Sequence, residues 1–148
     1  MRISRCTNFK WADVTPANYK PAGEEWKDVT RHTLYKPGES AFEARYFELG
    51  NGGYTSFERH RHEHIIIVLQ GEGEVRLGNE FQPILPFDLV TIGPDEPHQF
   101  RNTGESPFGF LCIVDAQRDR PVLLEPDTME PLGRPIDSSC EVKQSPNP

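Results

Sequence analysis

The sequence predicts an all-β domain, and two observations indicate it. Between residues 28 and 115, short candidate strands rich in apolar and β-branched residues are separated by turns rich in Gly, Pro and Asn. No stretch in this region has the period of about 3.6 residues that marks a helix. Short strands at this spacing are typical of a β-sandwich or a small barrel. Because no internal repeat is visible, we expect one barrel.

The expected strands follow one another along this region, and each ends at a turn signal. Their ranges are 29–35, 41–49, 54–60, 64–70, 71–80, 81–86, 87–93, 98–104 and 108–116. The clearest turns are KPGES after the first strand and GNGG after the second.

Two further segments flank the predicted barrel, which occupies 28–115. Residues 1–27 are mixed and polar but contain Trp11, Tyr19 and Trp26, and we expect an arm that packs on another surface, such as a partner subunit. Residues 116–148 hold six prolines and no strand or helix pattern, which predicts an extended C-terminal tail.

Composition excludes several classes of function. The 148 residues carry a formal net charge of −7 and no cluster of Lys and Arg, so we expect no nucleic-acid partner. No apolar run approaches the length of a membrane span, and the N-terminus lacks the apolar core of a secretory signal. The three cysteines, Cys6, Cys112 and Cys140, are scattered and form no CxxC pair. We therefore expect a cytoplasmic protein, with Cys112 a buried strand thiol.

The segment ERHRHEH places four candidate metal ligands at a spacing of two: Glu58, His60, His62 and His64. On an unbroken strand they share one face. A solvated strand end is the alternative interpretation. Inside a barrel, however, unpaired charged forms would cost several kcal/mol each, and a divalent metal removes that cost by taking neutral imidazoles and one carboxylate.

A second segment, FDLVTIGPDEPHQFRN, combines a short apolar strand with a tight turn framed by prolines. His98 follows that turn and begins the next strand. Strands one hairpin apart can bring His98 across from the first cluster, although a lone histidine is more often structural.

These two segments resemble the two motifs of the cupin superfamily. The first family motif is Gly, five residues, H-x-H, three or four residues, Glu, six residues, Gly. It maps onto Gly52, Glu58, His60, His64 and Gly71. The spacing fits, but Glu stands where His is usual, and His stands where Glu is usual.

The second family motif is Gly, five residues, P-x-G, two residues, His, three residues, Asn. It maps onto Phe87, Gly93, Asp95, His98 and Asn102, of which only the last two match the usual residue types. The resemblance covers roughly residues 40–115 and implies a single-domain jelly-roll barrel.

The resemblance implies a metal site made of Glu58, His60, His64 and His98. Small cupins with four histidines have His at the position of His64, which favours this set. His62 then lies in the bend between two strands, at the mouth of the barrel or beside the ligands. The alternative register uses His60 and His62 as the H-x-H pair, but it places Ile66 where a ligand is needed.

The ligand set suits one divalent transition metal per chain: Fe, Mn, Ni, Co, Cu or Zn. Related cupins with three His and one Glu are dioxygenases, so the resemblance implies an oxygenase acting on a small organic substrate. A non-redox isomerase or lyase and a non-catalytic binding protein are the alternatives, because one barrel hosts many reactions. We also expect a homodimer, since barrels of this class expose an edge strand and an apolar sheet face.

Overall fold

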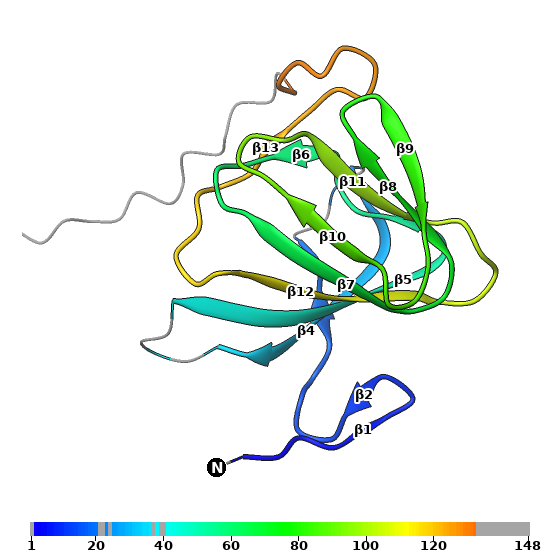
Figure 1. Ribbon diagram of the computed structural model, residues 1–148, viewed down its shortest axis with the longest axis vertical. Helices are drawn as coiled ribbons and strands as arrows, with labels where there is room; N and C mark the ends of the chain where they lie inside the picture. Colours follow the sequence, from blue (N-terminus) through cyan, green and yellow to red (C-terminus); the bar gives the residue numbers. More distant parts are fainter. Residues whose placement is uncertain (1, 21–22, 24, 37, 39–40, 133–148) are drawn as a thin grey trace, which may run out of the picture.

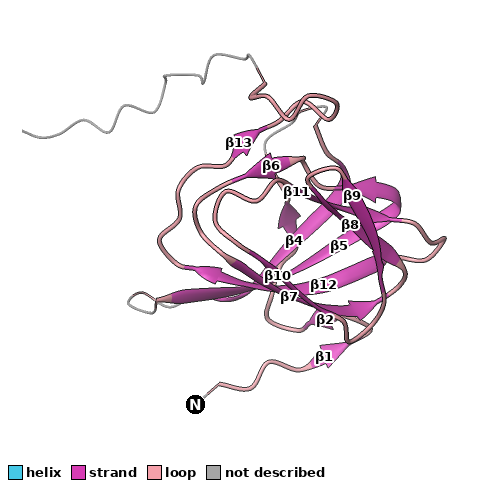
Figure 2. Ribbon diagram, turned by 45° about the horizontal axis from the view of Figure 1, so that its top comes forward, coloured by secondary structure: helices cyan, strands magenta, loops and turns pink. Residues whose placement is uncertain are grey.

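The computed structural model describes residues 2–20, 23, 25–36, 38 and 41–132, and it confirms the all-β prediction (Figures 1 and 2). No helix occurs among these residues. The strands are β1 (Cys6–Thr7), β2 (Lys10–Trp11), β3 (Ala17–Asn18), β4 (Lys27–Tyr35), β5 (Phe42–Tyr54), β6 (Glu58–Arg59), β7 (His64–Gln70), β8 (Gly73–Leu77), β9 (Glu80–Ile84), β10 (Leu89–Ile92), β11 (His98–Asn102), β12 (Phe108–Asp115) and β13 (Val122–Leu123). The described residues accordingly contain no helix that is long and apolar enough to span a membrane.

Whereas β1 and β2 pair separately, the strands β3 to β13 form one continuous hydrogen-bonded system that folds into two antiparallel sheets around one core. The first has the order β10-β7-β12-β5-β4-β3, and the second has the order β9-β8-β11-β6-β13. The sheets join where β11 pairs with β5, at Arg101 and Tyr54. This arrangement is a jelly roll, in which the strands of both sheets present alternate residues to the interior.

The interior is apolar at its centre. On β7, Ile66 and Val68 are fully buried, whereas the neighbouring Ile65 is 44% exposed, so burial alternates although residues 65–69 are all apolar. The buried cluster also contains residues from the other strands: Val29, Phe47, Leu49, Val75, Ile84, Ile92, Phe100, Phe108, Phe110, Cys112 and Val114. Cys112 is a buried free thiol, as predicted.

One expected turn is not a turn. β5 continues through GNGG to Tyr54 instead of ending at residue 49. Asp28 has a positive φ of 47° and lies at a register shift between β4 and β5. Its carboxylate occupies the space where a side chain at position 50 would lie, so Gly50 allows the long strand to pass the irregularity.

The segment after the barrel is more ordered than its sequence pattern indicates. Val122 and Leu123 of β13 pair with Arg59 and Glu58 of β6, and Leu124 is buried. Residues 116–132 therefore cover part of the second sheet. The rest of the predicted tail, 133–148, lies outside the described residues.

The N-terminal arm packs on its own barrel. Trp11 lies with its ring centroid 5.1 Å from that of Tyr46, on the outer side of β5, and Tyr19 lies 5.8 Å from Phe47 on the inner side.

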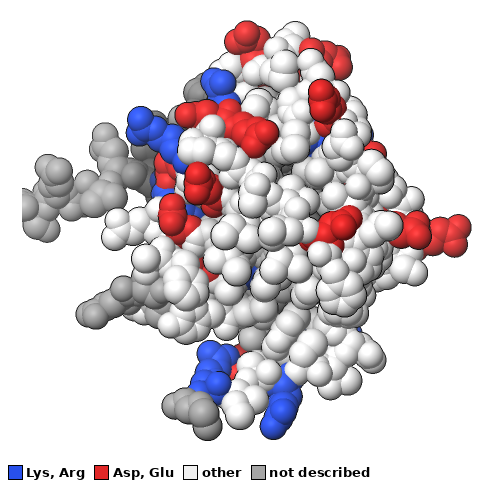
Figure 3. All heavy atoms as spheres, in the orientation of Figure 1, with Lys and Arg blue, Asp and Glu red and all other residues white. Residues whose placement is uncertain are grey.

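In Figure 3, the basic side chains of the described residues on the visible face lie in small separate groups, some of them beside acidic side chains.

Candidate metal centre

The strand register brings the two histidine-containing segments together. Glu58 of β6 and His98 of β11 are directly paired. The turn before β11 is fixed to the first segment, because the backbone N–H of Asp95 donates to the carbonyl oxygen of His60 at 2.7 Å. His64 begins β7 on the other sheet, next to Val114 of β12. Both sheets therefore contribute side chains to one end of the barrel.

Four imidazoles gather at this end. The ring centroid of His60 lies 3.6 Å from that of His62, 4.6 Å from that of His64 and 4.8 Å from that of His98. Among the described residues, potential ligand atoms come within 4.8 Å of one another in two groups that share His60. One group is Glu58, His60 and His98, and the other is His60, His62 and His64.

The hydrogen bonds leave nitrogen lone pairs facing the pocket. The Nδ1 atoms of His60 and His98 each lie 2.8 Å from a backbone carbonyl oxygen, that of His62 and that of Glu96 respectively. A carbonyl can only accept, so both Nδ1 atoms carry a proton and both Nε2 atoms have a free lone pair. Within the described part of the chain, Nε2 of His60 and Nε2 of His64 are buried without a hydrogen-bond partner. This is the state that a metal ligand requires.

Burial keeps the imidazoles of His60, His64 and His98 neutral. Desolvation lowers the pKa of His60 to about 4, and the charges of His98 and His62 add to this effect. Desolvation also lowers the pKa of His64 strongly and that of His98. A cluster that stays unprotonated at neutral pH fits a divalent cation, since ligation needs the neutral ring.

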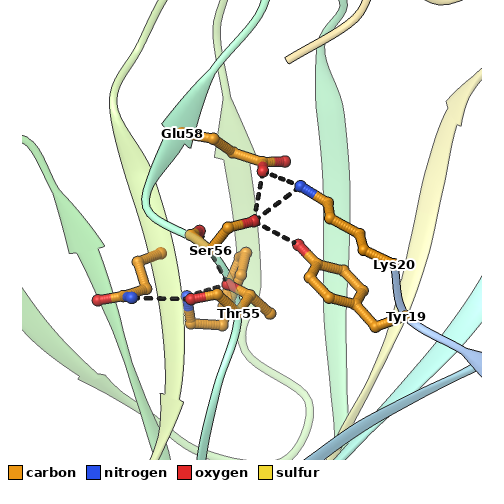
Figure 4. A network of polar contacts seen from close by, with 7 residues as sticks. Tyr19, Lys20, Thr55, Ser56 and Glu58 are labelled. Carbon is orange, nitrogen blue, oxygen red and sulfur yellow. Dashed lines mark hydrogen bonds and ion pairs between the residues drawn. The ribbon is translucent and has the colours of Figure 1, made fainter. Parts of the chain in front are cut away.

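Glu58 already has a partner from the N-terminal arm. Figure 4 shows Lys20 Nζ and Ser56 Oγ donating to Glu58 Oε2, with Tyr19 Oη 3.1 Å from Ser56 Oγ. Burial acts to raise the pKa of Glu58, but the charge and hydrogen bond of Lys20 outweigh it, so the pKa lies below its ordinary value. A metal bound by Glu58 would therefore share the carboxylate with Lys20 or displace it.

His62 does not project into solvent. Its side chain is only 8% exposed, and its ring stacks on His60 with an interplanar angle of 8°. Asp119, from the segment after β12, lies 2.8 Å from Nδ1 of His62 and accepts from the backbone N–H of Arg61 and His62. The sequence predicted His62 at the mouth of the barrel or beside the ligands; in the structure it lies at the pocket wall, stacked on His60.

The structure thus brings all four predicted residues to one place, with different proximities. Glu58, His60 and His98 form one group of ligand atoms, whereas His64 belongs to the second group with His60 and His62, and its ring centroid lies 5.3 Å from that of His98. Sequence reasoning did not find Lys20 or Asp119, which lie far from the motifs in sequence.

A pocket of about 210 Å³ is lined by Glu58, His60, His62, His64, Lys20 and Asp119. Lys20, Arg31, Arg45 and Arg118 give its wall a basic character. A second cavity of only about 30 Å³ is lined by Glu58, His64 and His98 together with aromatic core residues and Cys112. Sγ of Cys112 is 3.9 Å from Nδ1 of His64. The pocket can hold one small ligand in contact with both the histidines and the cations.

A jelly-roll barrel with a His and Glu cluster at one end defines the cupin class, and this chain belongs to the cupin family. The family model described as "Cupin domain" matches residues 45–114. The membership of the cupin superfamily that the two motifs predicted is therefore confirmed.

Particular relatives narrow the comparison. The chain is 39% identical over 118 residues to a Rhodospirillum rubrum protein described as 1-methylthio-D-xylulose 5-phosphate methylsulfurylase, covering 79% of this chain and 76% of that one. A crystal structure of a cupin-2 domain from Rhodospirillum rubrum matches at 36% identity with a TM-score of 0.74, covering 84% of both chains. A cupin 2 conserved barrel protein from Rhodopseudomonas palustris matches at 39% identity with a TM-score of 0.76, covering 84% of this chain and 86% of that one.

Proposed function

We propose that this protein is a metal-dependent cupin enzyme that acts on a small phosphorylated ketose carrying a methylthio group. The observation that carries the metal dependence is the pair of buried Nε2 atoms on His60 and His64, which have no hydrogen-bond partner among the described residues. The substrate class comes from the Rhodospirillum rubrum relative, whose similarity extends over most of both chains.

Four residues would hold the ion: Glu58, His60, His64 and His98. His62 is the alternative to His64, because it belongs to the same group of ligand atoms around His60. A bound divalent ion would act as a Lewis acid that polarises the substrate carbonyl and favours loss of a neighbouring proton.

The residues of the chain supply the other requirements. Asp119 accepts from Nδ1 of His62 and so holds the ring with its second nitrogen as a proton acceptor in the pocket. Lys20 offers an ammonium group that contacts Glu58. Tyr19, which is partly buried and packs against Phe47, lines the pocket from the arm and would limit the entry of water.

The oxygenase expected from the sequence has no specific support from the relatives. The methylsulfurylase named above is not described as an oxygenase. The non-redox alternative is therefore the one that we carry forward.

The test is turnover of 1-methylthio-D-xylulose 5-phosphate by protein purified without added metal and then analysed for its metal content. The sulfur of an added small thiol would take the methylthio group as a mixed methyl disulfide, and a proton would replace that group on the carbon. We expect mass spectrometry to detect both products, in air and under anaerobic conditions. The expected activity disappears after chelation, and in His98→Ala. Absence of turnover by metal-loaded protein would reject this substrate. Turnover coupled to O₂ uptake would favour the oxygenase hypothesis instead.

We also propose that the protein is a homodimer. The edge strand β10 and its preceding loop expose apolar side chains, with Phe87 at 84% and Leu89 at 63%. Sedimentation at micromolar concentration should give twice the chain mass, and Phe87→Glu with Leu89→Glu should give monomers. A monomeric wild-type protein would contradict the assignment.

A further inference from the structure

Two arginines lie side by side on the inner face of the first sheet. In the pairing of β4 with β5, Arg31 lies opposite Phe47, and Thr33 lies opposite Arg45. Because residues two apart share a face, Arg31 and Arg45 project from diagonal positions on the same side. Both line the pocket that the histidines also line.

The other two cations of this pocket are paired, Lys20 with Glu58 and Arg118 with Glu43. The carboxylate of Asp119 lies 2.8 Å from Nδ1 of His62. Among the described residues, neither Arg31 nor Arg45 forms an ion pair with a carboxylate. The pocket therefore carries two guanidinium groups without a carboxylate partner in the described part of the chain.

Arg45 is the more enclosed of the two, with 8% of its surface exposed. Its Nη2 donates to Sγ of Cys112 at 3.3 Å, and its guanidinium carbon lies 5.1 Å from the ring centroid of Phe47. The Nε atoms of Arg31 and Arg45 are both buried, and no described residue accepts a hydrogen bond from them. A buried guanidinium with unused donors and no anion is costly, so a ligand that supplies oxygen atoms would stabilise it.

We infer that Arg31 and Arg45 form a subsite for the phosphate group of the substrate, a phosphate monoester. This inference deepens the proposed function and rests on it for the identity of the anion. A phosphate monoester carries close to two negative charges at neutral pH, which matches the charge of these two guanidinium groups. The planar guanidinium groups can each donate two parallel hydrogen bonds to phosphate oxygens.

The placement also orients the substrate. The register puts Arg45 beside Cys112 of β12, and the next inward residue of β12, Val114, pairs with His64. A molecule whose phosphate contacts Arg31 and Arg45 therefore extends its other end toward the histidines. The pocket of about 210 Å³ limits the ligand to a small molecule, such as a short sugar phosphate.

The first test measures binding of inorganic phosphate to the metal-loaded protein by titration calorimetry. Arg31→Gln and Arg45→Gln should each weaken phosphate binding by about tenfold or more, because each removes charge-assisted hydrogen bonds. Arg45→Lys keeps the charge but loses the planar fork, and it should give an intermediate loss. The matched control is Arg120→Gln, which removes the same charge from an exposed residue outside the pocket lining and should change the affinity less than about twofold.

Direct ligation of phosphate by the metal gives a different result. In that case both glutamine variants would bind phosphate as the wild type does, and the inference would be wrong. It would also be wrong if the wild type bound no phosphate, or if acetate competed as well as phosphate. Metal content and thermal unfolding are recorded for every variant, and the less buried Arg31→Gln keeps the test valid if Arg45→Gln fails to fold.

A second measurement separates this inference from the proposed function. For the phosphorylated substrate, Arg31→Gln should raise KM far more than it lowers kcat, and this effect should vanish for the same sugar without its phosphate. Another outcome is phosphate binding that depends on both arginines, while the sugar phosphate is not turned over. That outcome would reject the proposed function but support the phosphate subsite.

Discussion

Acid should destabilise the metal-free protein well above the range in which carboxylates titrate. An unfolded histidine has a pKa near 6.5, whereas burial lowers the pKa of folded His60 to about 4. Between these values the unfolded chain binds more protons than the folded one. The free energy of unfolding therefore falls as the pH drops from 6.5 towards 4, and it levels off below that.

The magnitude follows from proton linkage. From pH 7.0 to pH 5.5, His60 alone should remove about 1.2 kcal/mol of stability. His64, whose pKa is lowered further by burial, should remove about the same amount over this interval. Together they cost about 2.5 kcal/mol, a large share of the roughly 5–15 kcal/mol that stabilises a typical domain. The lowered pKa of His98 acts in the same direction.

The assay is urea unfolding of chelator-treated protein at several pH values between 7.0 and 5.5. His60→Gln should reduce the loss by about 1.2 kcal/mol, since one titrating group is removed. Glu58→Gln is the matched control from the same site, because the pKa of Glu58 lies below this interval and the loss should persist. A stability that stays constant from pH 7.0 to pH 5.5 would refute the assignment of buried neutral imidazoles.

Three further outcomes test the site and its scaffold. His98→Ala should lose most of the bound metal in elemental analysis while His62→Ala retains it, and equal losses would reject the register that excludes His62 from the ligands. Glu58→Gln should lower metal occupancy, because a neutral amide oxygen is a poorer ligand than a carboxylate, whereas unchanged occupancy and activity would remove Glu58 from the site. Gly71→Ala should destabilise the fold by about 1–3 kcal/mol in urea unfolding, since Gly71 has a φ of 75° and an added Cβ would lie 2.3 Å from the carbonyl oxygen of Pro107. A loss of stability below about 0.5 kcal/mol in Gly71→Ala would contradict the interpretation that this position requires glycine.

The sequence predicted the barrel and the meeting of its two motifs because both depend on local spacing. The period-two pattern fixes which face of a strand is buried, and turn residues fix where most strands end. The pairing of Glu58 with His98 follows from those constraints. GNGG misled because its glycines serve a register shift opposite Asp28, and a shift of that kind has the same composition as a turn.

The contacts that complete the pocket could not be predicted in the same way. Lys20 meets Glu58 across 38 residues, and Asp119 meets His62 across 57. Both come from segments without a strand pattern, so no periodicity indicates where they lie. Arg31 and Arg45 stand within predicted strands, but an arginine on a strand is usually exposed, and only the closed barrel identifies these two as lining a pocket.

The departure of this chain from the usual motif and the contact made by its arm are physically linked. A histidine at position 58 would be neutral, and it could be buried without a countercharge. Glu58 is 7% exposed and ionised, so without a cation beside it its burial would be strongly unfavourable. Lys20 supplies that cation, and a metal bound by Glu58 would share the carboxylate with Lys20 or displace it. The arm is therefore part of the site, and its removal should weaken the barrel at Glu58 before it affects the distant core.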